Sequence, residues 1–275
     1  MGAPMGSERS SILNPSLSKK SFTVNPIGFF KSPQVAPYEA GRQPDAHHAE
    51  GVIELIQGEN FEQALEGLKT GQRIWILFQF HHNDHWNPKV LPPRGGNKKI
   101  GVFATRSPYR PNAIGMSTVE ILRIEGLNIY VSSSDLLDET PILDLKPYIS
   151  YADSFADQTP EWLLDTEKYT VSFSDLAQNQ INFLESHGLT QLRGFLEHQL
   201  EFEPTNHKKK RVKPDQTLAE GFVIAYKTWR VQFLVTQNEI HILKIFSGYS
   251  EQDLAVSADP YSDKSLHKEF NLAFK

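Results

Sequence analysis

Short strand-like runs separated by glycine- and proline-containing turns fill residues 24–156 of this 275-residue chain. Residues 74–80 form a near-continuous apolar run, which is typical of a strand buried on both faces. Residues 117–125 partly alternate between apolar and polar, a turn containing glycine and asparagine follows, and residues 129–131 return as a partner strand. Many short strands joined in this way predict a closed or nearly closed β-barrel.

One helix is predicted among these strands, between Asn60 and Gly71. Asn60 is a favourable N-cap residue, Gln63 lies at the capping-box position, and Gly71 suits the end of a helix. The apolar positions have the i, i+3, i+4, i+7 spacing of one helix face: Phe61, Ala64, Leu65 and Leu68. We expect this helix to cover one mouth or face of the barrel.

A different pattern begins after Pro160 and predicts an α+β unit. A helix is expected from Ser174 or Asp175 to about Ser186, with Gly188 just beyond its end. A second helix is expected over residues 189–200, and strands are expected over residues 169–173, 222–229, 231–236 and 239–246.

The expected fold class is therefore mainly β, with a small β-barrel domain and a smaller α+β domain after it. The first residues are rich in serine, proline and glycine and lack the apolar core of a signal peptide. The expected parts are a disordered leader at residues 1–21, the barrel domain at 22–158, the α+β domain at 159–250 and a polar tail at 251–275.

Composition excludes several classes of site. With 39% hydrophobic residues, the chain can bury one large core or two modest ones. It contains no cysteine, which excludes disulfides, thiolate metal sites and a cysteine nucleophile. No apolar run approaches the roughly 20 residues that a membrane helix needs, so we expect no membrane partner and a cytoplasmic protein.

The net charge of -5 argues mildly against nucleic-acid binding, but the basic residues cluster in two places. Either cluster could contact phosphates, and a solvated run of charged loop residues is the alternative for the second. The first contains Arg94, Lys98, Lys99, Arg106 and Arg110, and the second contains Lys208, Lys209, Lys210, Arg211 and Lys213.

A loop rich in arginine and proline lies at residues 105–117. Its prolines, Pro108 and Pro111, have fixed φ angles and can hold Arg106 and Arg110 in a preformed recognition surface. The alternative is a stiff connection with solvated arginines.

Two further polar segments follow strand-like runs. His81, His82, Asp84 and His85 have side chains that can ligate zinc, but adjacent histidines on a strand diverge, and a pocket wall is the other interpretation. Asp135 and Asp138 could serve as a base, a hydroxyl acceptor or a metal ligand, or could simply form turns. We predict no metal site.

Several of these loops together resemble one known family in order and spacing. The similar segments are residues 41–44, 91–97, 101–107, 110–117, 135–138 and 144–148. They resemble the TrmO family, also called TsaA-like or YaeB-like. The resemblance is strong from residue 22 to residue 156 and looser to about residue 246.

This resemblance implies an S-adenosylmethionine-dependent tRNA methyltransferase, which methylates N6 of threonylcarbamoyladenosine at position 37 in the anticodon loop of threonine tRNA. It also implies a small TsaA-like barrel that forms a homodimer. The cofactor-binding residues implied by motif position are Arg42, Gln43, Pro44, His81, His82, Arg106, Met116, Ser132, Ser133, Ser134 and Asp135.

Methyl transfer to a weakly nucleophilic nitrogen benefits from a group that accepts its proton, and Asp135 is our hypothesis for that catalytic group. A single-stranded loop suits contact from arginines and lysines. The residues expected to bind RNA are Arg94, Arg110, Lys208, Lys209, Lys210 and Arg211, while Arg106 and Met116 are expected to face the cofactor.

Two departures from the family pattern affect loop shape. Ala113 replaces a usual proline, and Glu139 replaces a usual glycine, which matters if that turn needs a positive φ. These departures keep open a cofactor- or RNA-binding module without catalysis. A metal-dependent hydrolase built on the histidine cluster is the third alternative.

Overall fold

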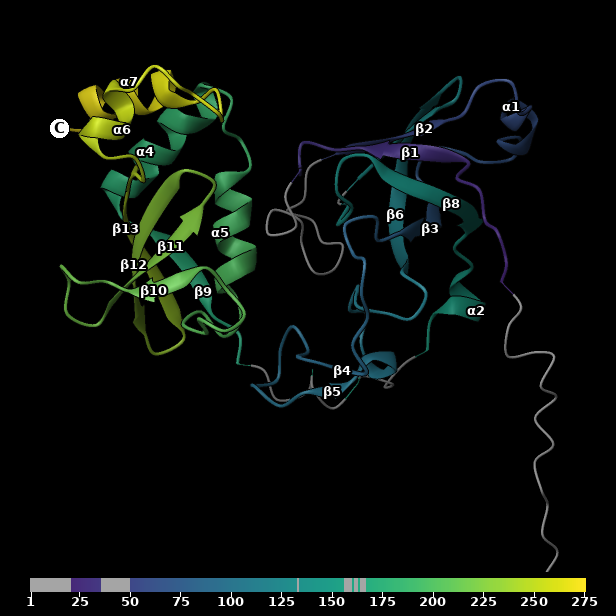
Figure 1. Ribbon diagram of the computed structural model, residues 1–275, viewed down its shortest axis with the longest axis horizontal. Coiled ribbons are helices and arrows are strands. Elements are labelled where there is room, and N and C mark those ends of the chain that lie inside the picture. The colour runs from purple at the N-terminus through teal and green to yellow at the C-terminus, as the bar shows by residue number, and fades with distance from the viewer. Residues whose placement is uncertain (1–20, 36–49, 133, 156–159, 161–162, 164–166) are drawn as a thin grey trace, which may run out of the picture.

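The computed structural model describes residues 21–35, 50–132, 134–155, 160, 163 and 167–275. Its described residues build two main sheets, each with its own hydrophobic core, which we call the first unit and the second unit (Figure 1). A third sheet has only two strands. In the described part of the chain, no helix is long and apolar enough to span a membrane.

The first unit is a closed ring of six antiparallel strands, in the order β1-β2-β7-β6-β3-β8. Strand β8 pairs with both β3 and β1, which closes the ring. The mainly β character expected for this half is confirmed. The strands are β1 Gly28–Lys31, β2 Gly51–Leu55, β3 Arg73–Gln79, β6 Ile114–Glu125, β7 Asn128–Val131 and β8 Thr140–Pro147.

Alternate residues of these strands fill the ring. In β3, Ile74, Ile76 and Phe78 are buried, whereas Trp75 and Leu77 are only half-buried. The prediction that this strand is buried on both faces was therefore wrong. The outer face of β3 has only partial cover, for example where the Trp75 ring lies 5.8 Å from the ring of Tyr148.

The helix predicted between Asn60 and Gly71 is reduced to one turn, α1, at Phe61–Ala64. Asn60 has a left-handed φ of 59° and does not cap the helix; its Nδ2 instead donates to Gln63 Oε1. Gly67, with a φ of 96°, prevents continuation as a helix. The apolar residues of the stripe still reach the core, because Phe61, Leu65 and Leu68 pack against it.

Short elements complete the first unit. Strands β4 (Lys89–Val90) and β5 (Ile100–Gly101) pair with each other, a 3-10 turn follows at Val102–Ala104, and helix α2 lies at Ser150–Asp153. These elements bring the proline loop at residues 91–99 out toward the second unit (Figure 1).

The second unit is a mixed five-stranded sheet in the order β10-β11-β12-β13-β9, in which β9 is parallel to β13. Its α+β character is as expected from the sequence. The strands are β9 Thr170–Phe173, β10 Val212–Pro214, β11 Gly221–Tyr226, β12 Trp229–Thr236 and β13 Glu239–Ser247; the helices are α4 Asp175–Ser186, α5 Leu192–Leu200, α6 Glu251–Ala255 and α7 Lys264–Ala273.

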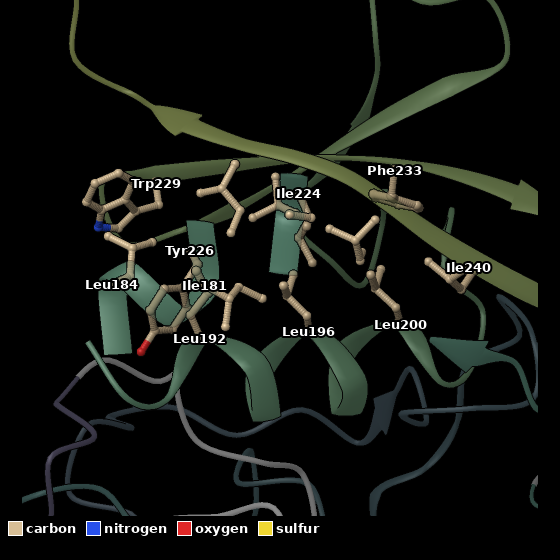
Figure 2. Close-up of a cluster of buried hydrophobic side chains, with 14 of the residues drawn as sticks. Ile181, Leu184, Leu192, Leu196, Leu200, Ile224, Tyr226, Trp229, Phe233 and Ile240 are labelled. Carbon is tan, nitrogen blue, oxygen red and sulfur yellow. The ribbon is translucent and has the colours of Figure 1, made fainter. Parts of the chain in front are cut away.

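Helix α5 packs its apolar face on this sheet. Leu192, Leu196 and Leu200 are fully buried and point from α5 toward the strands that carry Ile224 and Phe233 (Figure 2). The spacing of four residues places these leucines on one side of the helix, which explains how a short helix covers the sheet.

The segment expected as a polar tail, residues 251–275, instead forms α6 and α7 and belongs to the second core. Phe270 is 2% exposed, and His267 is fully buried with its ring 3.7 Å from the ring of Trp229. The weak apolar spacing of this segment gave no sign of its burial, because one of its buried side chains is a histidine and because Leu266 and Phe274 pack against the core while only partly buried.

Candidate functional site

Strand direction gathers most of the predicted site residues at one end of the ring. Strands β1, β3 and β7 run in one direction, and β6 and β8 run in the other, because every neighbouring pair is antiparallel. The ends of β1, β3 and β7 therefore meet the starts of β6 and β8. The residues at this end, which we call the site end, are Gln34, His81, Met116, Ser117, Ser132, Asp135 and Asp138.

Strand β6 presents alternating faces at the site end. Ser117 is 1% exposed and points inward, whereas Met116, its neighbour, is 47% exposed on the outer face. Gly115 has no room for a side chain, since an added Cβ would lie 2.3 Å from the ring of Phe78. The backbone at the start of β6 is thus packed tightly, which fixes both side chains that follow.

The central contact of the site end joins Ser117 to Asp135. Ser117 Oγ donates a hydrogen bond to Asp135 Oδ1 across 2.5 Å, and Asp135 is half-buried. Hydrogen bonds to an ionised carboxylate are short and strong, so this contact orients Asp135 relative to the ring. Ser117 lies within a motif that the sequence analysis used, but nothing in the sequence distinguished it as a site residue.

The serines before Asp135 have different environments. Ser134 is 2% exposed, and its Oγ accepts a hydrogen bond from the Leu136 backbone, so it stabilises the turn that carries Asp135. Ser132 is half-buried, and its backbone N–H donates to Glu120 O. Of the two serines of this run that the structure describes, Ser132 is the more exposed.

The turn before β8 explains one family departure. Glu139 has a φ of 58°, so the position does adopt the left-handed region that favours glycine. Glu139 forms an ion pair with Lys31, and Ser32 N–H donates to Asp138 Oδ1 across 3.0 Å. These bonds to β1 and its following loop hold the turn in a conformation that glutamate rarely adopts.

Gln34 is a residue that the sequence analysis missed. It is 7% exposed, and its Oε1 is buried with no hydrogen-bond partner among the described residues. Its backbone C=O accepts from Asp138 N–H, which places it beside the turn before β8. A buried acceptor without a donor is costly, so the site end is suited to a ligand that brings an N–H or O–H group.

The two histidines after β3 stack on each other, with ring centroids 4.0 Å apart. Burial, more than the neighbouring imidazole of His82, holds the pKa of His81 below its usual 6.5, and the carboxylates of Asp138 and Glu139 oppose this shift. His81 is therefore neutral near pH 7 and lies near the turn before β8.

His85 turns away from this pair toward Asp84, with Nδ1 2.8 Å from Asp84 Oδ1. Within the residues that the structure describes, no group of three or more histidine, aspartate or glutamate side chains could hold a metal ion. The histidine-based hydrolase thus has no support from the described residues.

The arginine and proline loop uses its two arginines differently. Arg110 Nη1 donates to Thr105 O across 2.8 Å and to Val102 O across 3.2 Å, so Arg110 stabilises its own loop. Arg106 is exposed. Contact of Arg110 with RNA remains a prediction, and one nitrogen of its guanidinium is already engaged by the loop.

The lysines of the lysine-rich loop, residues 208–213, also have different environments. Lys209 has a side chain 2% exposed and donates to Glu203 Oε2 across 2.7 Å, while Lys210 Nζ donates to the carbonyls of Gln199 and Phe202. Lys208 is exposed. Only part of the predicted RNA-binding cluster therefore faces solvent.

Four predicted cofactor-binding residues, Arg42, Gln43, Pro44 and Ser133, lie outside the described residues.

Comparison with known proteins gives one consistent family. The family model for the tRNA-methyltransferase O N-terminal domain matches residues 29–154. A tRNA (adenine(37)-N6)-methyltransferase of Escherichia coli is 35% identical over 221 residues, which cover 77% of this chain and 94% of that protein. A putative S-adenosylmethionine-dependent methyltransferase of Pseudomonas aeruginosa, RcsF, is 45% identical over 139 residues, or 49% of this chain and 60% of that protein, so the chain spans less than two thirds of this relative.

A solved structure shows a similar fold. The crystal structure of TrmO from Pseudomonas aeruginosa has a TM-score of 0.59 and 29% sequence identity, and the match covers 84% of this chain and 99% of that chain. A match of this extent cannot be confined to the closed ring, so the likeness includes part of the second unit.

Proposed function

We propose that this chain, which belongs to the TrmO family of S-adenosylmethionine-dependent tRNA (adenine37-N6)-methyltransferases, acts on threonylcarbamoyladenosine at position 37 of threonine tRNA. The observation that supports this proposal most is the Ser117–Asp135 hydrogen bond at the site end. It gives an oriented carboxylate where the ends of several strands meet.

The residues of the site end fit the chemistry of S-adenosylmethionine. This molecule carries a sulfonium cation, ribose hydroxyls, an amino-acid group and an adenine with N–H donors. The Asp135 carboxylate suits a cation or a hydroxyl, the buried Gln34 acceptor suits an N–H donor, and the exposed Met116 side chain offers an apolar, polarizable surface. Exposed Arg106 suits a carboxylate.

When bound, S-adenosylmethionine would supply a methyl group from a positively charged sulfur: the C–S bond would break as the C–N bond forms, and the sulfur would become a neutral thioether. The chain's contribution to such a displacement is largely positioning. Ser117 holds the Asp135 carboxylate, and Asp135 accepts the proton that the N6 nitrogen loses. Charge therefore balances, since the sulfonium loses its positive charge and Asp135 gains a proton.

The tRNA would lie against exposed cations of both units. Lys98 in the first unit and Lys208 in the second unit are exposed and can contact phosphates of the anticodon stem. Unpaired bases of the loop can stack on exposed rings such as Phe103, which is 77% exposed, and Tyr109, which is 37% exposed. Phe103 lies in the 3-10 turn just before the arginine and proline loop, and Tyr109 lies within that loop.

We further propose that the TsaA-like barrel domain occupies residues 22–158 and that the rest of the chain from residue 159 forms the second domain. Exposed apolar residues around the site end, among them Trp86 and Ile114, suit a homodimer interface. A cytoplasmic location suits an enzyme whose substrate is tRNA.

The experiment that tests the proposed function is methyl transfer to two matched tRNAs. Threonine tRNA carrying threonylcarbamoyladenosine and the same tRNA with unmodified adenosine are each incubated with the protein and S-adenosylmethionine. Nucleoside mass spectrometry is expected to find one added methyl group on threonylcarbamoyladenosine alone. Methylation of the unmodified adenosine would overturn the proposed substrate, and binding of cofactor and tRNA without methylation would favour the non-catalytic module.

A further inference from the structure

The two units are joined where the proline loop meets the segment after helix α5 (Figure 1). The Gly96 backbone N–H donates to Glu203 Oε1 across 2.9 Å, and Asn206 Nδ2 donates to Asn97 Oδ1 across 3.2 Å. These hydrogen bonds link residues more than 100 positions apart in the sequence. We call residues 94–97 together with residues 201–206 the joint.

Arg94 contributes to the joint because its planar guanidinium group stacks on an aromatic ring. The Arg94 guanidinium lies 3.5 Å from the ring centroid of Phe202, and its Nη2 lies 4.0 Å from Glu201 Oε2. Arg94 and Glu201 have side chains that are each only 25% exposed. A guanidinium stacked on a ring and partly withdrawn from water is a specific contact, and it occupies one of the residues expected to bind RNA.

Glu203 is the centre of the joint, because both of its carboxylate oxygens are used. Oε1 accepts from Gly96, and Oε2 accepts from Lys209. Its backbone has a left-handed φ of 46°, which is unfavourable for glutamate and persists only where the surroundings stabilise it. The buried lysine thus has a structural role: it orients the carboxylate that holds the first unit.

The joint leaves exposed cations on both of its sides. Lys98 and Lys99 belong to the proline loop, and Lys208 and Arg211 belong to the lysine-rich loop; all are exposed. The acidic side chains of the joint are paired with Arg94, Lys168 and Lys209. The surface near the joint is therefore basic although the chain carries a net charge of -5.

We propose that Glu203 is a positioning residue that joins the second unit to the proline loop, so that lysines of both units contact the same tRNA. The inference rests on the proposed function for the identity of the RNA. Binding by two linked surfaces is tight only when their geometry allows both to engage at once. A fixed joint supplies that geometry before the tRNA arrives.

The sign of the effect separates this proposal from simple electrostatics. Replacement of Glu203 by alanine removes a negative charge from a basic surface, and this alone would strengthen binding to a polyanion. Loss of the joint would instead weaken binding, because the two sets of lysines would no longer be held together. The two explanations predict opposite changes in the Kd for tRNA.

The test compares full-length Glu203→Ala with Glu220→Ala. Glu220 is an exposed glutamate of the same unit with a φ of 60°, so this control removes the same charge at a similar backbone conformation. Since Glu203→Ala removes the carboxylate that Lys209 contacts, the double variant Glu203→Ala, Lys209→Met removes this buried cation together with the carboxylate and tests the joint without it.

Three quantities are measured: the Kd for tRNA, the separation of the two units by small-angle scattering, and the KM for S-adenosylmethionine. We expect both Glu203 variants to raise the Kd for tRNA about tenfold, the equivalent of one lost charge-assisted hydrogen bond. Scattering should show a larger radius of gyration, while the KM for S-adenosylmethionine stays at the wild-type value. The Glu220→Ala control, which only removes a negative charge, should give a Kd for tRNA equal to or slightly below that of the wild-type protein.

An unchanged or lower Kd for tRNA in the double variant would overturn the proposal, as would an unchanged radius of gyration. The Kd and the scattering do not depend on methyl transfer. If the wild-type protein bound tRNA but methylated nothing, the proposed function would fail, and these two measurements would still decide the role of Glu203.

Discussion

Ser117 Oγ and Asp135 Oδ1 lie 2.5 Å apart and join strand β6 to the loop after strand β7. The donor is fully surrounded, since Ser117 is 1% exposed, while the acceptor is half-buried. Because the buried Ser117 hydroxyl holds Asp135 Oδ1 in place, the direction of the other carboxylate oxygen, Oδ2, is fixed as well. The contact therefore sets the orientation of the group that we assign to proton acceptance.

Substitution of Asp135 should separate binding from catalysis. Asp135→Asn keeps the shape of the side chain but removes the proton-accepting charge, so we expect kcat to fall by about 100-fold or more. Ser117→Ala leaves the carboxylate but frees its orientation, and we expect a smaller fall of about tenfold. Both are measured by single-turnover methylation, with the affinity for S-adenosylmethionine determined in parallel.

The adjacent hydroxyl is the matched control for Ser117→Ala. Thr118 Oγ1 is buried and has no hydrogen-bond partner within the described residues, so Thr118→Val should leave methylation near the wild-type rate and should not destabilise the fold. Wild-type kcat in Asp135→Asn would show that Asp135 is not the proton acceptor.

The close packing at the start of β6 predicts a stability difference between two glycines. An added Cβ at Gly115 would lie 2.3 Å from the Phe78 ring, whereas one at Gly101 would meet nothing within 4 Å. Gly115→Ala should lower the unfolding free energy by about 1–3 kcal/mol because the added methyl group would overpack the core against the aromatic ring of Phe78. Gly101→Ala should change it by less than about 0.5 kcal/mol; denaturant unfolding of both variants checks this, and equal stabilities would contradict the packing.

The buried imidazole of His267 predicts a pH dependence for the second unit. Burial holds its pKa below the usual 6.5, more strongly than the nearby Asp263 carboxylate raises it. Its ring nitrogens lie 2.8 Å from Ser247 Oγ and 2.9 Å from Thr228 Oγ1, so the neutral ring is well accommodated.

The unfolded chain then binds the proton more tightly than the folded chain, and the free energy of unfolding falls as the pH drops below about 6.5. His267→Gln should flatten this dependence, while replacement of the exposed His241 should not. Denaturant unfolding between pH 5 and pH 8 measures both, using the range over which histidine titrates. Because burial also lowers the pKa of His81, part of the slope is expected to remain in His267→Gln. A slope as steep as that of the wild-type protein would assign the effect to another group.

Charge reversal should distinguish surface lysines that contact RNA from those that do not. Lys208→Glu is expected to weaken tRNA binding and to reduce the slope of log Kd against log salt concentration by about 1. Lys268→Glu, an exposed lysine on helix α7, away from strand β10 (Figure 1), changes the net charge equally and should have little effect. Equal weakening by both variants would show that only net charge matters.

Local signals in the sequence predicted local structure well. Ser174 was expected near the start of a helix, and its Oγ accepts from Ala177 N–H at the beginning of α4. The prediction that Asn60 caps a helix was wrong, because asparagine favours both N-cap positions and the left-handed region, and here it adopts the left-handed region. The local sequence alone does not distinguish an N-cap from a left-handed residue, because tertiary contacts decide between the two conformations.

Long-range relationships were not accessible in the same way. Ring closure through β8 brings Gln34 beside Asp138, and no periodicity connects residues that far apart. Lys209 belongs to a basic run that predicted phosphate contact, but its side chain is buried and forms an ion pair with Glu203 of the joint. The resemblance to a family predicted the loops of the site, and the strand order explains why the described loops after β3 and β7 and before β6 and β8 lie at one end of the ring.

Methylation of a defined tRNA tests the substrate and the role of Asp135 together. Threonine tRNA carrying threonylcarbamoyladenosine is incubated with S-adenosylmethionine and either the wild-type protein or Asp135→Asn, and the nucleosides are analysed by mass spectrometry. The wild-type protein is expected to add one methyl group to threonylcarbamoyladenosine, and Asp135→Asn is expected to do so at a rate lower by about 100-fold or more. No added methyl group with the wild-type protein, although it binds both tRNA and S-adenosylmethionine, would contradict this expectation.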